Sequence, residues 1–389
     1  MLKFKSTTLL SLIGLLSLAV VASARLPQAS LQLITQPPLD QLVPFDATGE
    51  TAQSAPILTL QLRDAAGQPL PKAKVHLQLF APSHNPWFST DFPVVEGTQL
   101  LELTAETERG ELQLQQMLPI RGNYRLAVEV LPVDTDAFAP IAQTLTLRVS
   151  EHSNKYRNFA ILAVMLWLVG LGGGWLIGKP QVIQPGEIAP QSIRLLLSAV
   201  VLVAIVALLV VNISAELAES HAHHHEHSEV SSAQIPQGIA QSQGLEVRII
   251  GDTQATVGQL AQLQIQAIDQ QTGQPATDLA FQIQTRQLEE NWLAFAYTGT
   301  PDPAGQLAWR QQFFDGAPHR LEVTVLPQST AGRQFKPFKV VQEIEAEGVA
   351  PPLLVRLIAL GYFTSIVLLG LVMGLWLQRR QSWAQAQGS

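Results

Sequence analysis

The stretch "LRDAAGQPLPKAKVHLQL", residues 62–79, decides the fold of this chain. From Ala73 onward, apolar and polar residues alternate, which is the pattern of a β-strand with one buried face. The Asp64 carboxylate and the Gly-Gln-Pro triplet 67–69 stand before the strand and supply turn chemistry. The same layout recurs as "IDQQTGQPATDLAFQIQ", residues 268–284. The sequence therefore predicts one strand-and-turn unit that is used twice.

A second pair of matching stretches extends this interpretation. "GELQLQQMLPIRGNYRLAVEVLP" (110–132) aligns with "GQLAWRQQFFDGAPHRLEVTVLP" (305–327). About a hundred residues of such short strands most often form a β-sandwich. We therefore predict two all-β, immunoglobulin-like sandwich domains at 29–150 and 243–347, related by an internal duplication. The alternative is convergent strand-and-turn composition without duplication.

These motifs resemble the YtkA-like domains, which are small exported immunoglobulin-like sandwiches. The resemblance is carried by a strand ending in Asp, a Gly-x-Pro turn, an A-x-V-x-L strand (73–77) and a late G-x-Y-x-L strand (122–126). The second copy departs from the pattern, with "ATDLAFQI" where the first has "PKAKVHLQ". YtkA-like domains occur near copper and cytochrome-oxidase assembly proteins, so the resemblance implies metal handling. It supplies no catalytic residues.

Composition points to a membrane protein. The chain is 47% hydrophobic and 14% charged, and the apolar residues are concentrated in blocks. Residues 1–24 begin with lysines and end in Ala-Ser-Ala, which is typical of a cleaved signal peptide; an uncleaved anchor is the alternative. Three later runs are long enough to cross a bilayer as transmembrane helices. These predicted spans are 159–178, 195–213 and 353–377.

The order of the predicted spans gives a topology. Export of the first sandwich places 179–194 in the cytoplasm as a loop, and the His-rich segment 214–235 and the second sandwich outside. The tail 378–389 then lies in the cytoplasm, in agreement with its paired arginines and the positive-inside rule. We expect a bacterial inner (plasma) membrane protein whose two β domains are extracytoplasmic.

Glycines in the first and last predicted spans recur at intervals of four, which places small residues on one helix face and allows close helix packing. We expect these faces to pack within this chain or against a membrane-protein partner; ordinary glycine usage in membrane helices is the alternative. No charged residue or histidine lies in 159–178 or 195–213, which argues against a transport pathway in this chain alone. The glycines are Gly170, Gly174, Gly178, Gly370 and Gly374.

The segment "HAHHHEH" (221–227) holds five of the nine histidines of the chain. Imidazole is a suitable ligand for zinc, copper(II) and nickel, and such binding weakens as histidines gain protons. A polar linker and a pH-sensitive patch are the alternatives. The candidate metal ligands are His221, His223, His224, His225, His227 and Glu226.

Other features narrow the function. The absence of cysteine excludes thiolate metal sites and cysteine nucleophiles, and we find no motif of an enzyme active site. The net charge of −7 with no basic run argues against nucleic acid as a partner. We expect His76, His84 and His319 to be surface residues rather than ligands.

Two functions follow from the sequence. The first is a membrane-anchored, extracytoplasmic protein that binds a divalent metal through the His-rich segment, for buffering or delivery to a partner. The alternative is a non-catalytic structural or assembly subunit of a membrane complex. A transporter subunit is a third possibility, and another chain would then supply the pathway.

Overall fold

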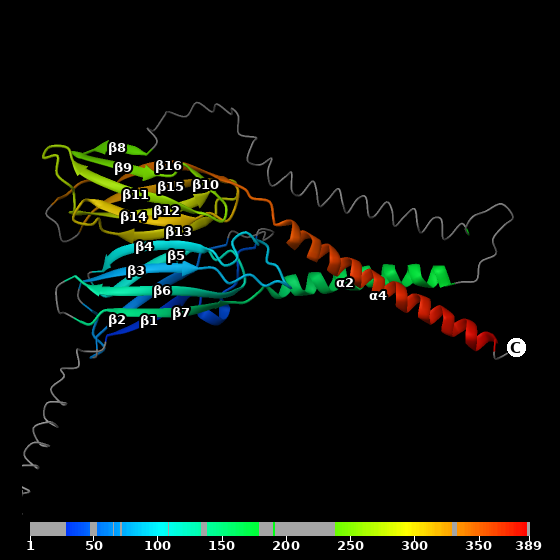
Figure 1. Ribbon diagram of the computed structural model, residues 1–389. Coiled ribbons are helices and arrows are strands. Elements are labelled where there is room, and N and C mark those ends of the chain that lie inside the picture. Colours follow the sequence, from blue (N-terminus) through cyan, green and yellow to red (C-terminus); the bar gives the residue numbers. More distant parts are fainter. Residues whose placement is uncertain are drawn as a thin grey trace, which may run out of the picture.

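The computed structural model describes residues 29–46, 53–64, 66–70, 72–107, 109–133, 138–178, 190, 238–328 and 333–386. Within these residues, strands form two sheets of eight strands each. Two long helices leave one end of the β structure and cross each other (Figure 1).

The first half of the β structure contains seven strands and one short 3-10 helix. Along each strand buried and exposed positions alternate, as the sequence pattern predicts. The elements are β1 (Ser30–Gln36), η1 (Leu39–Gln41), β2 (Ile57–Arg63), β3 (Ala73–Phe80), β4 (Gln99–Thr107), β5 (Glu111–Gln116), β6 (Gly122–Pro132) and β7 (Ile141–Val149).

The second half contains nine strands, of which seven correspond to those of the first half. The elements are β8 (Ile239–Ser242), β9 (Leu245–Gly251), β10 (Gln254–Thr256), β11 (Leu260–Asp269), β12 (Leu279–Gln287), β13 (Leu293–Gly299), β14 (Gln306–Gln312), β15 (Pro318–Pro327) and β16 (Phe338–Glu347).

Strand pairing repeats from one half to the other. The antiparallel pairs β1–β2, β2–β5, β3–β4, β3–β6 and β6–β7 of the first half match β9–β11, β11–β14, β12–β13, β12–β15 and β15–β16 of the second. The short strands β8 and β10 are additions at the edges of the second half. The shared pairing order supports the internal duplication over convergent composition.

The turns repeat as well. Asp64 and Asp269 each accept hydrogen bonds from backbone N–H groups of the turn that follows. Gly110 and Gly305 occupy equivalent turns with positive φ, and their carbonyls accept the equivalent N–H groups. A Cβ at Gly110 would stand 2.7 Å from the carbonyl oxygen of Leu62, so only glycine allows the two chain segments to approach this closely.

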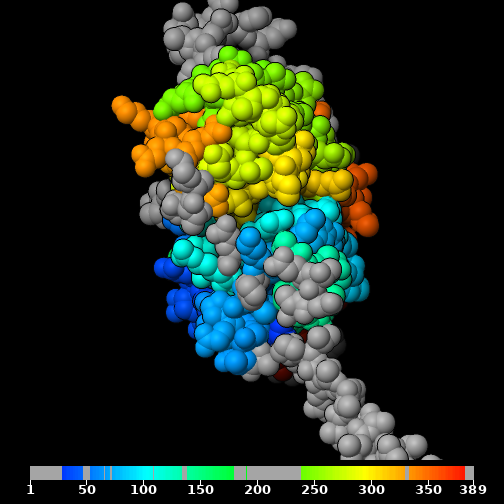
Figure 2. Space-filling model, turned by 90° about the vertical axis from the view of Figure 1, so that its left-hand side faces the viewer, coloured from blue at the N-terminus to red at the C-terminus, as the bar shows by residue number. Residues whose placement is uncertain are grey.

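The two halves share both sheets. Strand β5 pairs with β13, and β4 pairs with β14, so each sheet runs from one half into the other. The registers are equivalent, because Leu114 faces Tyr297 just as Trp309 faces Leu103. This is the pattern of a two-fold symmetric interface, here formed within one chain. Figure 2 looks at the end away from the helices and shows the second half, green to orange, lying directly on the first half.

One continuous core lies between the sheets and includes buried residues of both halves. The sequence predicts two separate β domains at 29–150 and 243–347, whereas the structure joins them into one body through shared sheets and a shared core. We call this body, residues 29–149 and 238–347, the double sandwich. The two stacked β-sheets confirm the predicted β-sandwich architecture. That the sandwiches are immunoglobulin-like stays a prediction.

Helices α2 (Ser153–Gly178) and α4 (Leu353–Ala386) follow the last strand of each half. In the described part of the chain, these two helices are long and apolar enough to cross a membrane. The predicted spans 159–178 and 353–377 lie within them. The predicted signal peptide 1–24, the loop 179–194, the span 195–213 and the His-rich segment 214–235 lie outside the described residues, apart from the single residue Pro190.

Candidate functional site

The helix pair brings four of the five sequence-selected glycines to one contact. A Cβ at Gly170 would stand 2.1 Å from the Val367 carbonyl oxygen, and one at Gly370 would stand 2.2 Å from that of Trp167. Gly174 and Gly374 make the same reciprocal approach, at 2.0 Å from the Leu371 oxygen and 2.2 Å from the Leu171 oxygen. These distances leave no room for a side chain, so the two backbones touch directly.

The fifth glycine, Gly178, lies at the edge of the contact, where a Cβ would meet the Gln378 side chain at 2.8 Å. In contrast, Gly172 and Gly361 have nothing within 4 Å of a built Cβ. Because contacts of α2 are mirrored in α4, the two-fold relation of the double sandwich continues into the helices. The glycine face of α2 therefore packs against the glycine face of α4 within this chain.

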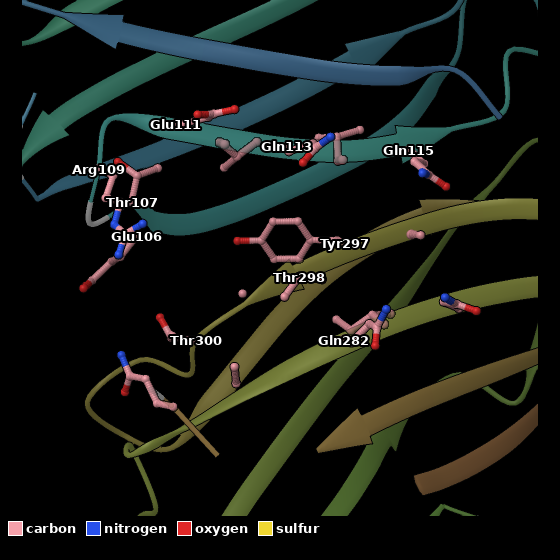
Figure 3. Close-up of a pocket in the computed structure, with 18 residues that line it drawn as sticks. Glu106, Thr107, Arg109, Glu111, Gln113, Gln115, Gln282, Tyr297, Thr298 and Thr300 are labelled. Atoms are coloured by element: carbon pink, nitrogen blue, oxygen red, sulfur yellow. The ribbon is translucent and has the colours of Figure 1, made fainter. Parts of the chain in front are cut away.

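A groove of about 530 Å³ lies on the outer face of one sheet, where the two halves join (Figure 3). Strands β5 and β13 pair over only three residues, and the pairing ends at Leu114 and Tyr297. The lining is mostly polar, with the neutral side chains Gln113, Gln115 and Gln282 together with the charged residues Glu106, Arg109 and Glu111. Figure 3 shows the Tyr297 ring between strands of the two halves. Burial raises the pKa of the Tyr297 phenol, which keeps it neutral.

The equivalent place on the other sheet is a second, smaller groove of about 410 Å³, and its lining includes Glu102 and Arg310. There the Arg310 guanidinium donates to Glu102 at 3.3 Å, and His76 lies 3.8 Å from the same carboxylate. By the matched strand registers, the groove has Ala296 where this cluster has Glu102. The two junctions have therefore diverged in charge: the first groove has a small residue at the position where the second has the centre of an ionic cluster.

Buried polar side chains lie in the layer where the halves meet. Gln116 and Gln311 occupy equivalent positions and are both almost fully buried. The Thr285 hydroxyl donates to the side-chain oxygen Oε1 of Gln311 at 3.2 Å, and the Thr98 hydroxyl donates to Oε1 of Gln312 at 3.0 Å, the latter between the two halves. The Thr98–Gln312 bond therefore links the two halves at a position where most of the glutamine side chain is buried.

His319 is a buried residue, and the expectation that it lies on the surface is wrong. It takes the place that Tyr124 holds in the first half, on the inward face of its strand, and its exposure is 0%. Its Nδ1 lies 2.7 Å from the carbonyl oxygen of Ala317, which makes Nδ1 the protonated nitrogen. Burial lowers the pKa of His319 to about 4, so the ring is neutral in the folded chain.

The other two histidines of the double sandwich are partly exposed. His76 belongs to the ionic cluster described above, and the His84 ring contacts the Glu96 carboxylate. No group of three or more potential metal ligands occurs among the residues that the structure describes. The predicted ligands, His221 to His227 with Glu226, lie outside those residues, and the geometry of that segment is not part of the structure.

Comparisons with known proteins give no family. No family model matches the chain, and no curated protein matches it. Among solved structures, trypsin-activated alpha-2-macroglobulin from Escherichia coli is 12% identical over 81% of this chain and 16% of its own, with a TM-score of 0.21. The adhesin InvE of Yersinia pseudotuberculosis is 12% identical over 82% of this chain and 61% of its own, with a TM-score of 0.18. The chain thus spans about one sixth of the macroglobulin, and at these scores the likenesses carry no argument about function.

Proposed function

We propose that this chain is a membrane-anchored, non-catalytic assembly subunit that presents the double sandwich to a partner protein outside the cytoplasm. The observation that carries the proposal is the symmetric helix pair. Helices α2 and α4 leave the same end of the double sandwich and contact each other in parallel through reciprocal glycine contacts (Figure 1). Such a stem holds a rigid body at a fixed orientation above a bilayer.

The proposed topology requires a third crossing. If α2 and α4 both enter the membrane from the side of the double sandwich, the chain between 178 and 238 returns once across the bilayer. The run 195–213 is long and apolar enough for that return. The His-rich segment then lies on the same side of the membrane as the double sandwich. We propose that this membrane is the bacterial inner membrane.

The groove at the junction of the two halves is the proposed partner surface. Its lining is mostly polar and includes the charged residues Glu106, Arg109 and Glu111, and its volume lies in the range of pockets that hold ligands. A substitution at its floor, Ala296→Arg, would fill it with a long charged side chain. The matched control is Gln78→Arg, which adds the same charge to β3 of the other sheet, next to the strand that is equivalent to β13.

Native gel electrophoresis of mildly solubilised membranes tests this proposal. We expect the wild-type chain and Gln78→Arg to migrate in a complex larger than the chain itself, and Ala296→Arg to migrate without it. Migration of the wild type at its own mass would contradict the assembly role. An intact complex in Ala296→Arg would contradict the choice of the groove.

The histidine run supports a second function, which is capture of a divalent metal beside the membrane. Five imidazoles within seven residues give zinc, copper(II) or nickel several ways to bind two or three nitrogens at once. No cysteine competes for the metal, so binding should depend on these histidines and weaken as the pH falls.

Equilibrium dialysis of the full chain with zinc measures this second function. The comparison variant replaces the five histidines of 221–227 with alanine. We expect the variant to lose the tightest class of bound zinc at neutral pH while its thermal unfolding stays unchanged. Equal zinc binding by both proteins would show that the segment is a spacer.

A further inference from the structure

The β3–β4 loop, residues 81–98, exposes two large aromatic side chains at the end of the double sandwich that carries the helices. Trp87 is 69% exposed and Phe88 is 64% exposed. The second half connects its equivalent strands with only residues 288–292. The long loop is thus an elaboration of one copy, and no part of the shared fold needs its aromatic tip.

Contacts with α4 fix the height of this tip. The Tyr362 hydroxyl donates to the Trp87 carbonyl oxygen at 2.7 Å, and the Phe88 ring stacks on the Tyr362 ring, with centroids 6.2 Å apart and planes at 4°. Lys155 at the start of α2 also pairs with Asp91 of the loop. The loop is therefore tied to both helices rather than standing free.

The position of Tyr362 along α4 indicates how deep the loop tip would lie in a bilayer that α4 crosses. Arg356 is the last charged residue before the uncharged run 357–378. Tyr362 follows Arg356 by six residues, which is about 9 Å along a helix axis. The headgroup region on each side of a bilayer is about 5–8 Å thick. Tyr362, and the aromatic tip beside it, therefore stand where the headgroups meet the hydrocarbon.

Several backbone groups of the tip have hydrogen-bond partners within the protein. The Asn85 side-chain oxygen accepts the N–H groups of Trp87 and Phe88, at 2.9 and 3.3 Å. Arg121 donates to the Ser89 carbonyl oxygen at 3.2 Å. The Thr90 N–H donates to the Glu96 carboxylate at 2.9 Å. Such pairing lowers the cost of placing these groups in a region poor in water.

We infer that the tip of the β3–β4 loop, Trp87 and Phe88, inserts into the outer leaflet of the bilayer beside α4. Aromatic rings are favoured at this level of a membrane. The inference rests on the proposed membrane anchoring of α2 and α4 and adds a third membrane contact, made by the double sandwich itself. With this contact the body is fixed against tilting on its helical stem.

Spin labelling tests this inference, because the chain has no native cysteine. Single cysteines replace Trp87 or Phe88, and the full chain is placed in phosphatidylethanolamine–phosphatidylglycerol vesicles. The readout is the collision rate of each label with oxygen, which concentrates in lipid, relative to a water-soluble nickel chelate. Leu131→Cys is the matched control, since Leu131 is also an exposed apolar residue and lies at the far end of β6. Leu369→Cys, on the exposed face of α4, reports on membrane anchoring.

We expect the oxygen-to-nickel ratio at 87 and 88 to be several-fold higher than at 131 and to approach that at 369. A ratio at 87 and 88 equal to that at 131, with a high ratio at 369, would overturn the inference and leave the anchoring intact. Protection from both reagents at 87 and 88 would indicate a protein contact and would also overturn it. A low ratio at 369 would refute the anchoring itself.

A second measurement avoids the loss of the aromatic ring. Trp87→Phe keeps the packing of the tip, and its fluorescence is compared with that of the wild type in vesicles of brominated lipid. The difference between the two spectra isolates Trp87 from the other six tryptophans. Quenching of this difference by bromines near the headgroup is expected, and an unquenched difference would overturn the inference.

Discussion

Substitution of Gly174 by alanine should force the two helices apart. The added Cβ would lie 2.0 Å from the Leu371 carbonyl oxygen, whereas ordinary contact begins at 3.4 Å. The difference, 3.4 − 2.0 = 1.4 Å, is the separation that the backbones must gain at this point. Neither the carbonyl group nor the helix backbone has a rotamer to which it can move. Overpacking of this kind costs about 1–3 kcal/mol.

The assay is a pulsed electron-spin distance measurement between labels at Val169→Cys and Leu369→Cys, which are exposed and equivalent positions on the two helices. In the Gly174→Ala protein the mean distance between the two labels should increase by about 1.4 Å, which is the separation calculated above, or the distribution of label distances should become broader. Gly172→Ala is the control, because nothing lies within 4 Å of its Cβ. An unchanged distance in Gly174→Ala, or an equal change in both variants, would refute the reasoning.

Three further outcomes are expected for the double sandwich. His319 should make the free energy of unfolding fall by about 3 kcal/mol as the pH drops from about 6.5 to about 4, because the unfolded chain then binds a proton that the buried ring cannot accept. Urea titrations should show this fall for the wild type and a smaller fall for His319→Tyr. Parallel pH profiles of the two proteins would contradict the assignment. Tyr124→Phe removes a hydroxyl that accepts a hydrogen bond from the Ile120 N–H and donates one to the Ile120 carbonyl oxygen. The free energy of unfolding should therefore fall by about 1–3 kcal/mol. An unchanged urea midpoint would show that these two hydrogen bonds do not stabilise the fold. Gly305→Ala should lower the melting temperature more than Gly67→Ala, because both glycines have positive φ but only the Cβ at 305 meets a backbone atom, the Ala267 oxygen at 2.6 Å; equal losses would show that the close approach does not matter.

The strands and the repeat could be predicted from the sequence because their signals are local. Alternation from Ala73 onward and the Asp64 turn depend on neighbours a few residues apart, and the structure places strands and a turn there. The glycine spacing likewise identifies the helix face that packs. The partner of that face is a non-local property, and the structure supplies it: α4 for α2 and α2 for α4.

The joining of the halves could not be read from the sequence. Gln116 and Gln311 are polar residues, and a pattern-based reading places glutamine on the solvent side of a strand, yet both are buried at the junction. His319 misleads in the same way, because histidine at the start of a strand carries no sign that its neighbours are Trp292 and Phe313. The place of Ala296 in the groove is likewise non-local, because it follows from the pairing of Ala296 with Gln115 of the other half.

The two-fold relation that runs through both sheets and both helices has an evolutionary consequence. A single unit of one sandwich and one helix, existing before the duplication, would have had the same edges and the same glycine face to offer a second copy of itself, and would have formed a homodimer. Fusion of two such genes makes the partner permanent and frees each copy from self-complementarity. One of the two junctions, each made of residues from both copies, then became able to keep an ionic cluster and the other to lose it, something that no symmetric ancestor with identical subunits could have done.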